Sequence, residues 1–319
     1  MVRRLHGSGD AWKDPLPMLP WYTLALALSA GMSLGTCFTV FKRANVMRDA
    51  GHGTMFMTCV CLGLWSIASL TRTFAIFMHD RSDNLELPPI LHTSIATEVL
   101  FNATSIWFVL VAYEIQRRAL RPRTDSSNRT AMFWYTTVVY GITAALLVAF
   151  VVLEGSSFQL LVDDGDGRGP QPESLVLFII ERVSWVTHII RTASVLFIGG
   201  MAAWLFLKRR QVVFRKMPGG LLLIVTLFSL LHLPYIVIHP LCDTKVIDVE
   251  RHPMLPSVAK LVTFSTGAVV SLLMGLSVAS FDAFFHVDEG WGSSAKASFH
   301  HEEFFVLSDS SPLGRRRRI

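Results

Sequence analysis

Charged residues are scarce in this chain: Asp, Glu, Lys and Arg make up only 17% of its 319 residues, against roughly 25% in an ordinary soluble domain. Long stretches contain none, and 51% of the residues are hydrophobic. A soluble domain has no need of uncharged runs of about 20 residues, the length with which a helix crosses the roughly 30 Å hydrocarbon layer of a bilayer. Inside lipid such runs must be helical, because a helix satisfies its own backbone polar groups.

Cysteine is scarce as well, with only Cys37, Cys59, Cys61 and Cys242. Their spacing matches neither a disulfide framework nor a zinc motif, and the first three lie within apolar runs, which favours a role as small packing residues. No Gly-rich phosphate loop or nucleophile elbow is present. We therefore expect no enzymatic activity, no cofactor and no structural metal.

The apolar runs predict an all-α membrane bundle of seven spans with short connections. We expect a tail over residues 1–20, a transmembrane domain over 21–285 and a polybasic tail over 286–319. The predicted spans are Trp21–Phe41, Thr54–Met78, Pro89–Ile115, Thr130–Leu153, Ser174–Leu207, Pro218–His239 and Pro256–Phe281.

Basic residues gather on one side of these spans. The loops after the first, third and fifth spans, together with the C-terminal tail, hold 18 of the 29 Lys and Arg residues. Such loops face the cytosol, which predicts an N-terminus outside and a C-terminus in the cytosol. The same distribution, in short loops rather than on one domain face, argues against nucleic acid as the partner.

Ionisable side chains inside the spans gather in the outer half of the predicted bundle. Such groups usually face the bundle interior and pair with one another. Residues spaced three and four apart share one helix face: Glu181, Ser184, His188 and Arg191 do so in the fifth span, and Glu98, Asn102 and Ser105 in the third. Two interpretations stay open, an outward-facing ligand pocket and an ion-pair network that fixes helix register. The candidate residues are Arg72, Glu98, Asn102, Glu181, His188, Arg191, His232 and Lys260.

Small residues mark possible helix contacts. Gly31 and Gly35 form a GxxxG pair, and Gly267, Ser271 and Gly275 repeat at four-residue spacing. Such patterns allow close approach of two helix backbones. We expect these contacts within the chain rather than between two copies.

Other seven-span classes fit the sequence less well. A retinal protein needs a lysine in the middle of the last span, whereas Lys260 lies about one turn into it. A zinc-dependent amide hydrolase needs several histidines, and only His188 and His232 lie more than one turn inside a span. A transporter usually carries paired internal repeats, and none is detectable. The usual outer disulfide and the Asn-Pro-x-x-Tyr pattern of G protein-coupled receptors are missing too.

Three segments resemble the tobamovirus multiplication protein family. They are Leu70–Phe74 late in the second span, Val111–Ala119 at the end of the third, and His252–Leu255 before the seventh. The chain departs from the family at Gln116 and Arg117, where a Tyr-His pair is usual. The resemblance implies a multi-pass protein of the endomembrane or vacuolar membrane without enzymatic activity. In plants, members anchor tobamovirus replication proteins, and some are discussed as receptor-like.

Together these features predict a receptor-like or scaffold membrane protein that binds partners through its basic cytosolic loops. Basic residues near a bilayer surface also attract anionic headgroups, at about 1 kcal/mol each. The alternatives are a G protein-coupled receptor with an outer polar pocket and, third, a transporter; the plasma membrane is the alternative location. The predicted contacts to a cytosolic protein or lipid are Arg117, Arg118, Arg121, Arg123, Lys208, Arg209, Arg210, Arg315, Arg316, Arg317 and Arg318.

Overall fold

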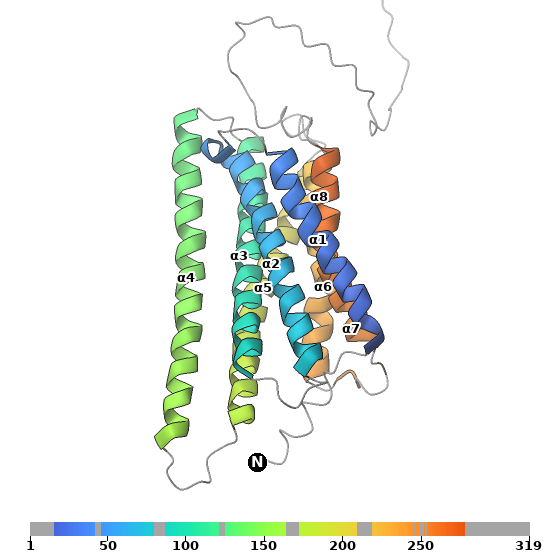
Figure 1. Ribbon diagram of the computed structural model, residues 1–319. Helices are drawn as coiled ribbons and strands as arrows, with labels where there is room; N and C mark the ends of the chain where they lie inside the picture. The colour runs from blue at the N-terminus through green and yellow to red at the C-terminus, as the bar shows by residue number, and fades with distance from the viewer. Residues whose placement is uncertain are drawn as a thin grey trace, which may run out of the picture. The chain divides into compact units, whose positions relative to one another are not determined.

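The computed structural model describes residues 16–41, 46–79, 87–120, 125–163, 172–208, 219–244, 246–248, 252 and 254–277. Every regular element in these ranges is helical, as Figure 1 shows. Seven helical spans among them are long and apolar enough to cross a membrane. The predicted all-α class with seven spans is thus confirmed at the level of helix number and composition. The predictions for residues 1–15 and 286–319 lie outside the described part of the chain.

The long helices follow the apolar runs. The 21 residues of the first contain no Asp, Glu, Lys, Arg or His, and at roughly 1.5 Å of rise per residue they extend about 30 Å, the thickness of the hydrocarbon layer. The bounds are α1 (Leu19–Thr39), α2 (Ala50–His79), α3 (Leu87–Leu120), α4 (Asp125–Asp163), α5 (Pro172–Lys208), α6 (Gly219–Asp243), α7 (Met254–Phe264) and α8 (Thr266–Leu276).

Several bounds differ from the predicted ones. Helix α4 has 39 residues and extends well beyond 130–153 at both ends, and α3 continues past Ile115 to Leu120. Hydropathy identifies only the part of a helix that is apolar enough for the hydrocarbon layer, whereas the helix itself can continue with polar side chains into the membrane–water interface. The predicted seventh span consists of two helices, α7 and α8, separated at Ser265.

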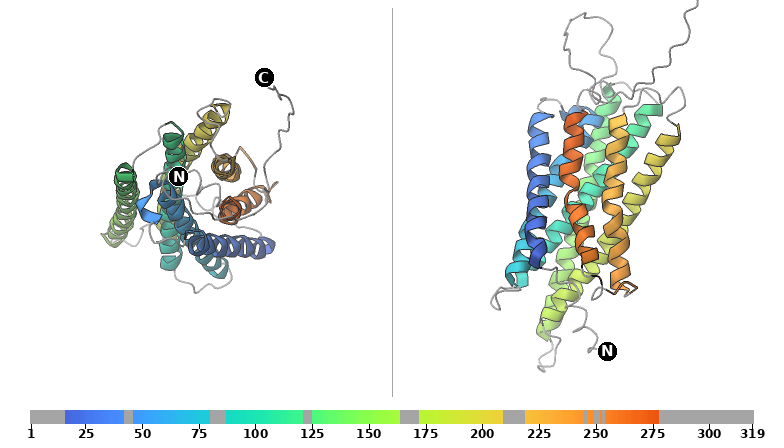
Figure 2. Two further views of the ribbon diagram at one scale, coloured as in Figure 1. Left: turned by 90° about the horizontal axis from the view of Figure 1, so that it is seen from above. Right: turned by 90° about the vertical axis from the view of Figure 1, so that its right-hand side faces the viewer.

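Six of the seven spans form a closed ring. Helix α1 packs on α2, α2 on α3, α3 on α5, α5 on α6 and α6 on α7, while α8 returns to α1. Helix α4 packs against α3 and α2 from outside, and Figure 2 shows it to one side of the other helices. Only 11% of the most apolar stretch of α4 is buried, against 72% for α3. Most of the α4 surface is therefore left for lipid.

Large aromatic side chains fill the middle of the ring. The rings of Phe108 and Phe228 stack with their centroids 3.6 Å apart, and Trp65 meets Phe101 edge-on at 4.9 Å. Along α3, Phe108 lies between Glu98, which is half-buried, and Glu114, which is buried; these are the two carboxylates of that helix. An apolar layer thus separates the polar groups at the two ends of the bundle.

The close contact between α1 and α8 uses serines rather than the predicted glycine pair. Ser33 Oγ donates a hydrogen bond to the carbonyl oxygen of Gly267 (3.3 Å), and Ser271 Oγ donates to Ser33 Oγ (3.1 Å). A Cβ added at Gly31, Gly35 or Gly275 would meet nothing within 4 Å. The prediction of a GxxxG contact at Gly31 and Gly35 is therefore wrong, since these two residues turn away from any neighbouring helix.

The break between α7 and α8 is bridged by one side chain of α1. Ser29 Oγ donates to the carbonyl oxygen of Phe264, the last residue of α7, and accepts a hydrogen bond from the Ala268 N–H of α8 at 3.2 Å. Ser265 Oγ bonds back to the carbonyl oxygen of Val262 (2.7 Å). Backbone groups on both sides of the break are thus satisfied inside the bundle, as an apolar environment requires.

Substituting Gly267 with leucine is expected to destabilise the bundle. An added Cβ would lie 2.8 Å from Ser29 Cβ and 3.2 Å from the Ser29 carbonyl oxygen, and overpacking of this kind costs about 1–3 kcal/mol. The unfolding free energy in detergent measures the loss. Gly275→Leu, on the same helix but facing open space, serves as the control. Equal losses for the two variants would show that α1 and α8 are not in close contact.

Candidate ligand-binding site

A cavity of about 80 Å³ opens at the end of the bundle where α1 begins. Its lining comes from the six spans of the ring, and no described residue of α4 contributes. Four lining residues carry charge: Arg72 on α2, Glu98 on α3, Arg191 on α5 and Lys260 on α7. Aromatic and hydroxyl side chains make up most of the remaining wall. The ring arrangement thus brings ionisable groups from four helices to one place.

Glu98 is the centre of this group, with a side chain that is 12% exposed. One carboxylate oxygen accepts hydrogen bonds from Arg191 Nη2 (2.7 Å) and Thr187 Oγ1 (2.8 Å). The other lies 3.5 Å from Arg72 Nη1. One carboxylate therefore ties together α2, α3 and α5.

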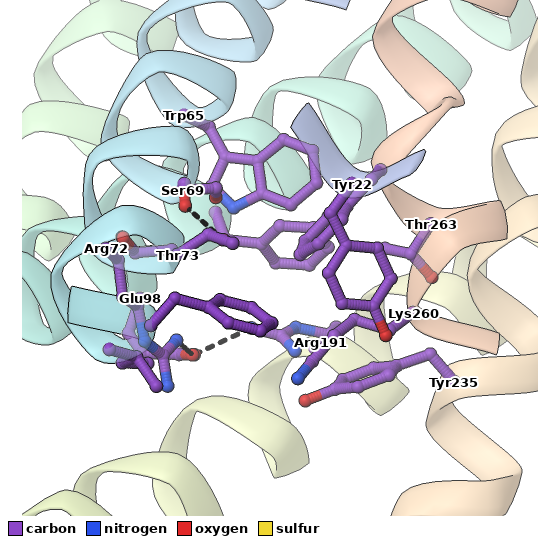
Figure 3. A pocket seen from close by; sticks show the side chains of 15 residues that line it. Tyr22, Trp65, Ser69, Arg72, Thr73, Glu98, Arg191, Tyr235, Lys260 and Thr263 are labelled. Atoms are coloured by element: carbon purple, nitrogen blue, oxygen red, sulfur yellow. Dashed lines mark hydrogen bonds and ion pairs between the residues drawn. The ribbon is translucent and has the colours of Figure 1, made fainter. Parts of the chain in front are cut away.

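Two of the three cations that line the cavity, Arg191 and Lys260, lie near aromatic rings. The guanidinium carbon of Arg191 is 3.8 Å from the ring centre of Phe101 and 5.6 Å from that of Tyr235. Lys260 Nζ lies 5.8 Å from the ring centre of Tyr22. Figure 3 shows Arg191 reaching towards Glu98 on one side, with Lys260 and Tyr235 on the other. Cation–π contacts of this kind stabilise desolvated cations.

Of the eight predicted site residues, Arg72, Glu98, Arg191 and Lys260 line the cavity. His188 is buried beside it on α5, where its ring stacks on that of His239 with centroids 5.4 Å apart. The side chain of Glu181 lies outside the described part of the structure. The stripe predicted on the fifth span is thus described only at its last two members.

Asn102 and His232 do not line the cavity. Both are fully buried; His232 Nδ1 lies 2.8 Å from the carbonyl oxygen of Phe228, and its ring packs between Phe101 and Phe228. Neither amide atom of Asn102 has a hydrogen-bond partner within the described ranges. Residues 98 and 102 are four apart and share a face of α3. Asn102 nevertheless lies one helical turn further from the end of the bundle where the cavity opens.

Sequence reasoning missed Thr187, which donates to Glu98, and the uncharged polar residues of the lining, namely Tyr22, Ser69, Thr73, Thr97, Tyr235 and Thr263. A signal existed for Thr187, which is four residues from Arg191 and therefore on the same face of α5. Ser69 and Tyr235 carried no such signal, because uncharged polar residues occur throughout these spans.

A second ionic cluster lies at the other end of the bundle. Glu114 on α3, only 1% exposed, accepts hydrogen bonds from Arg118 Nε (2.9 Å), Tyr135 Oη on α4 (2.9 Å) and the Arg117 guanidinium. Arg118 also pairs with Asp49, just before α2. This cluster joins α2, α3 and α4 and is the main polar contact that α4 makes with the ring.

This geometry gives Arg117 and Arg118, the first two predicted contacts to a cytosolic partner or lipid, partners within the chain. Both side chains are only 9% exposed and are paired within the chain. The reason is the continuation of α3 to Leu120, which places them three and four residues after Glu114 on one helix face. Lys208 is the half-buried last residue of α5. The other predicted contacts lie outside the described ranges: Arg121, Arg123, Arg209, Arg210, Arg315, Arg316, Arg317 and Arg318.

Asp49 makes the stability of this cluster pH-dependent. Burial alone would raise the pKa of Asp49, but the hydrogen bond from His52 and the Arg118 guanidinium outweigh it and lower the pKa from 3.8 to about 2. A depressed carboxyl pKa contributes stability above about pH 4 that is lost as the pH falls towards 2, at most about 2 kcal/mol here. We expect Asp49→Asn to destabilise the protein at pH 6 and to have little effect near pH 2, measured as unfolding free energy in detergent. A difference that does not change with pH would contradict this pairing.

No three His, Cys, Asp or Glu side chains of the described ranges are grouped so as to hold a metal ion. No protein-family model matches the chain, and no curated protein matches it significantly.

Proposed function

We propose that this chain is a receptor-like, multi-pass membrane protein that binds a small ligand in the cavity at the end where α1 begins. The observation that carries the proposal is that all six spans of the ring contribute to one cavity. A ligand there would touch every helix of the ring at once, so binding could change how the helices pack. An ion-pair network that only fixed helix register would not need an open space of about 80 Å³.

The distribution of charge supports an orientation for this receptor. The loops after α1, α3 and α5 hold many of the Lys and Arg residues, and the helix ends that they connect lie opposite the cavity; such loops face the cytosol. In this orientation the N-terminus and the cavity mouth face outside or the lumen. The apolar layer around Phe108 and Phe228 then separates the cavity from the cytosolic end. The resemblance to tobamovirus multiplication proteins favours an endomembrane or vacuolar location.

Proximity labelling from the C-terminal tail tests the proposal. A receptor transmits the state of its cavity to the cytosolic side, so the labelled proteins should differ between the wild type and the double variant Glu98→Gln/Arg191→Gln. Gly275→Ala, which faces open space, controls for mutation as such. An identical set of labelled proteins in all three, at equal abundance of the chain, would overturn the receptor function.

The second candidate is a scaffold that holds cytosolic partners through its basic segments. The concentration of Lys and Arg residues on one side of the spans favours it, and so does the family resemblance. Partner binding by a scaffold would depend on those segments and would be unaffected by changes in the cavity. Under this alternative, replacing Arg315, Arg316, Arg317 and Arg318 with glutamine removes labelled partners, whereas the cavity double variant does not.

A further inference from the structure

We infer that Cys37, Cys59 and Met274 form a binding site for a Cu(I) ion, in place of the packing role that the sequence favours for the cysteines. The site is separate from the cavity, and its ability to bind metal does not depend on the proposed function. Three features of the described structure support it: the contacts among the three sulfur atoms, the charge that an apolar site tolerates, and the position of the site in the bundle.

The three sulfur atoms lie together where α1, α2 and α8 meet (Figure 1). Cys59 Sγ on α2 donates a hydrogen bond to Met274 Sδ on α8 at 3.2 Å, and the thiols of Cys37 on α1 and Cys59 are hydrogen-bonded to each other. Both thiols are free, and none of the three side chains is more than 7% exposed. Cys59 and Met274 are 215 residues apart, so spacing along the sequence did not reveal the group.

This set of donor atoms favours a soft metal ion. Thiolates and thioethers select Cu(I), whereas carboxylate and carbonyl oxygens select Mg²⁺ and Ca²⁺. A structural zinc site nearly always has four ligands drawn from Cys, His and carboxylates, and no three such side chains are grouped in the part of the chain that the structure describes. An iron–sulfur cluster is typically held by four cysteines. Cu(I) accepts fewer ligands, and a thioether is one of its usual donors.

Replacing a proton by Cu(I) leaves the charge of this site unchanged. The thiolate is the form of cysteine that binds metal, so binding to Cys59 releases its S–H proton, which now bonds to Met274. Because H⁺ and Cu⁺ carry the same charge, no net charge is added to an apolar region, where charge is costly. Cys37 provides the third sulfur as a neutral thiol, and the copper stays Cu(I) throughout. A divalent ion requires the loss of a second proton.

Only a small adjustment of the side chains is needed. A trigonal ion with metal–sulfur bonds of about 2.3 Å holds its ligands about 4 Å apart, whereas the sulfurs of Cys59 and Met274 are 3.2 Å apart. Met274 can move in this way, because its unbranched side chain is flexible. Cys37 lies two residues before the end of α1 and is 7% exposed, so an ion meets it first. In the proposed orientation this end faces the cytosol, where thiols stay reduced.

Titration of the full chain with Cu(I) in a non-ionic detergent, without oxygen, tests the site. The copper is added as its acetonitrile complex in competition with bicinchoninate, a chelator whose absorbance reports the copper that the protein does not hold. We expect one bound ion per chain, with sulfur neighbours at about 2.3 Å in its X-ray absorption spectrum. Even partners outside the ligand shell change metal affinity by about 10–100-fold, so Cys59→Ala and Met274→Leu should each weaken binding by roughly 100-fold.

Cys61→Ala is the matched control. Cys61 lies on the same helix as Cys59 and is also buried, but it packs in a different cluster, with Trp107, so this variant should bind Cu(I) like the wild type. Met274→Leu keeps an apolar side chain of similar volume and is expected to fold. If the wild type retains no Cu(I), if Met274→Leu retains it fully, or if Cys61→Ala weakens binding as much as Cys59→Ala, the site is wrong. Displacement of the bound copper by an equal concentration of Zn²⁺ would overturn the choice of Cu(I).

Discussion

Replacing Glu98 by leucine is expected to lower the free energy of unfolding by about 3–5 kcal/mol, the usual loss when one partner of a buried ion pair is removed. The side chain of Arg191 is only 7% exposed and would keep its charge with no carboxylate beside it. Thr187 would lose the acceptor of its hydrogen bond as well. Denaturant unfolding in detergent micelles measures the loss.

The double variant Glu98→Leu/Arg191→Met provides the control for this prediction. It removes both charges of the buried pair, while Arg72, with 30% of its side chain exposed, can still reach water. We expect the double variant to be more stable than Glu98→Leu alone, because no buried guanidinium is left unpaired. Losses that simply add in the double variant would show that Glu98 and Arg191 do not interact.

Glu114→Leu is expected to cause a loss of similar size at the other end of the bundle. Glu114 accepts hydrogen bonds from Arg117, Arg118 and Tyr135. Its removal takes this carboxylate away from two arginine side chains that are only 9% exposed. Because Asp49 still pairs with Arg118, the larger part of the cost comes from Arg117. We expect about 3–5 kcal/mol, measured by the same unfolding titration.

Tyr135→Phe is the matched control at this cluster. It removes one donor to Glu114 but leaves both arginines paired, so a loss of about 0.5–1.5 kcal/mol is expected. If Tyr135→Phe were as damaging as Glu114→Leu, the cluster would be stabilised by the contact between α3 and α4 rather than by charge pairing.

The seven spans were predictable because the bilayer imposes a length and a polarity that a sequence displays directly. Where the bilayer imposes neither a length nor a polarity, as at the end of a helix or at a break within one, the predicted bounds differ from the structure. Helix α4 extends beyond its apolar part, and the break at Ser265 lies in a stretch without proline or charge. Ser29 bridges that break from a segment more than 230 residues away, and such a partner cannot be found by reading α7 and α8 alone.

The depth of the candidate site residues in the bundle was predictable, but the direction in which each helix face points was less so. Alternating helix directions place Arg72, Glu98, Arg191 and Lys260 at one end, and the structure brings these four to one cavity. Spacing along one helix does not give the rotation of that helix in the bundle. Gly31 and Gly35 share a face that turns outwards, and Asn102 shares a face with Glu98 but lies below the cavity. The pairing of Arg117 and Arg118 with Glu114 was not foreseen because the predicted span ended at Ile115.

The interruption at Ser265 divides the last span into a half that lines the cavity and a half that packs on α1. Lys260, Thr263 and Phe264, which line the cavity, all precede it, whereas Gly267 and Ser271, which hold α8 to α1, follow it. Residues at the ends of helical elements commonly act as hinges. An occupant of the cavity would therefore act on α7, while α8 stays packed against α1, and the Ser29 hydroxyl, which contacts both helices, would be the first group to register a change between them.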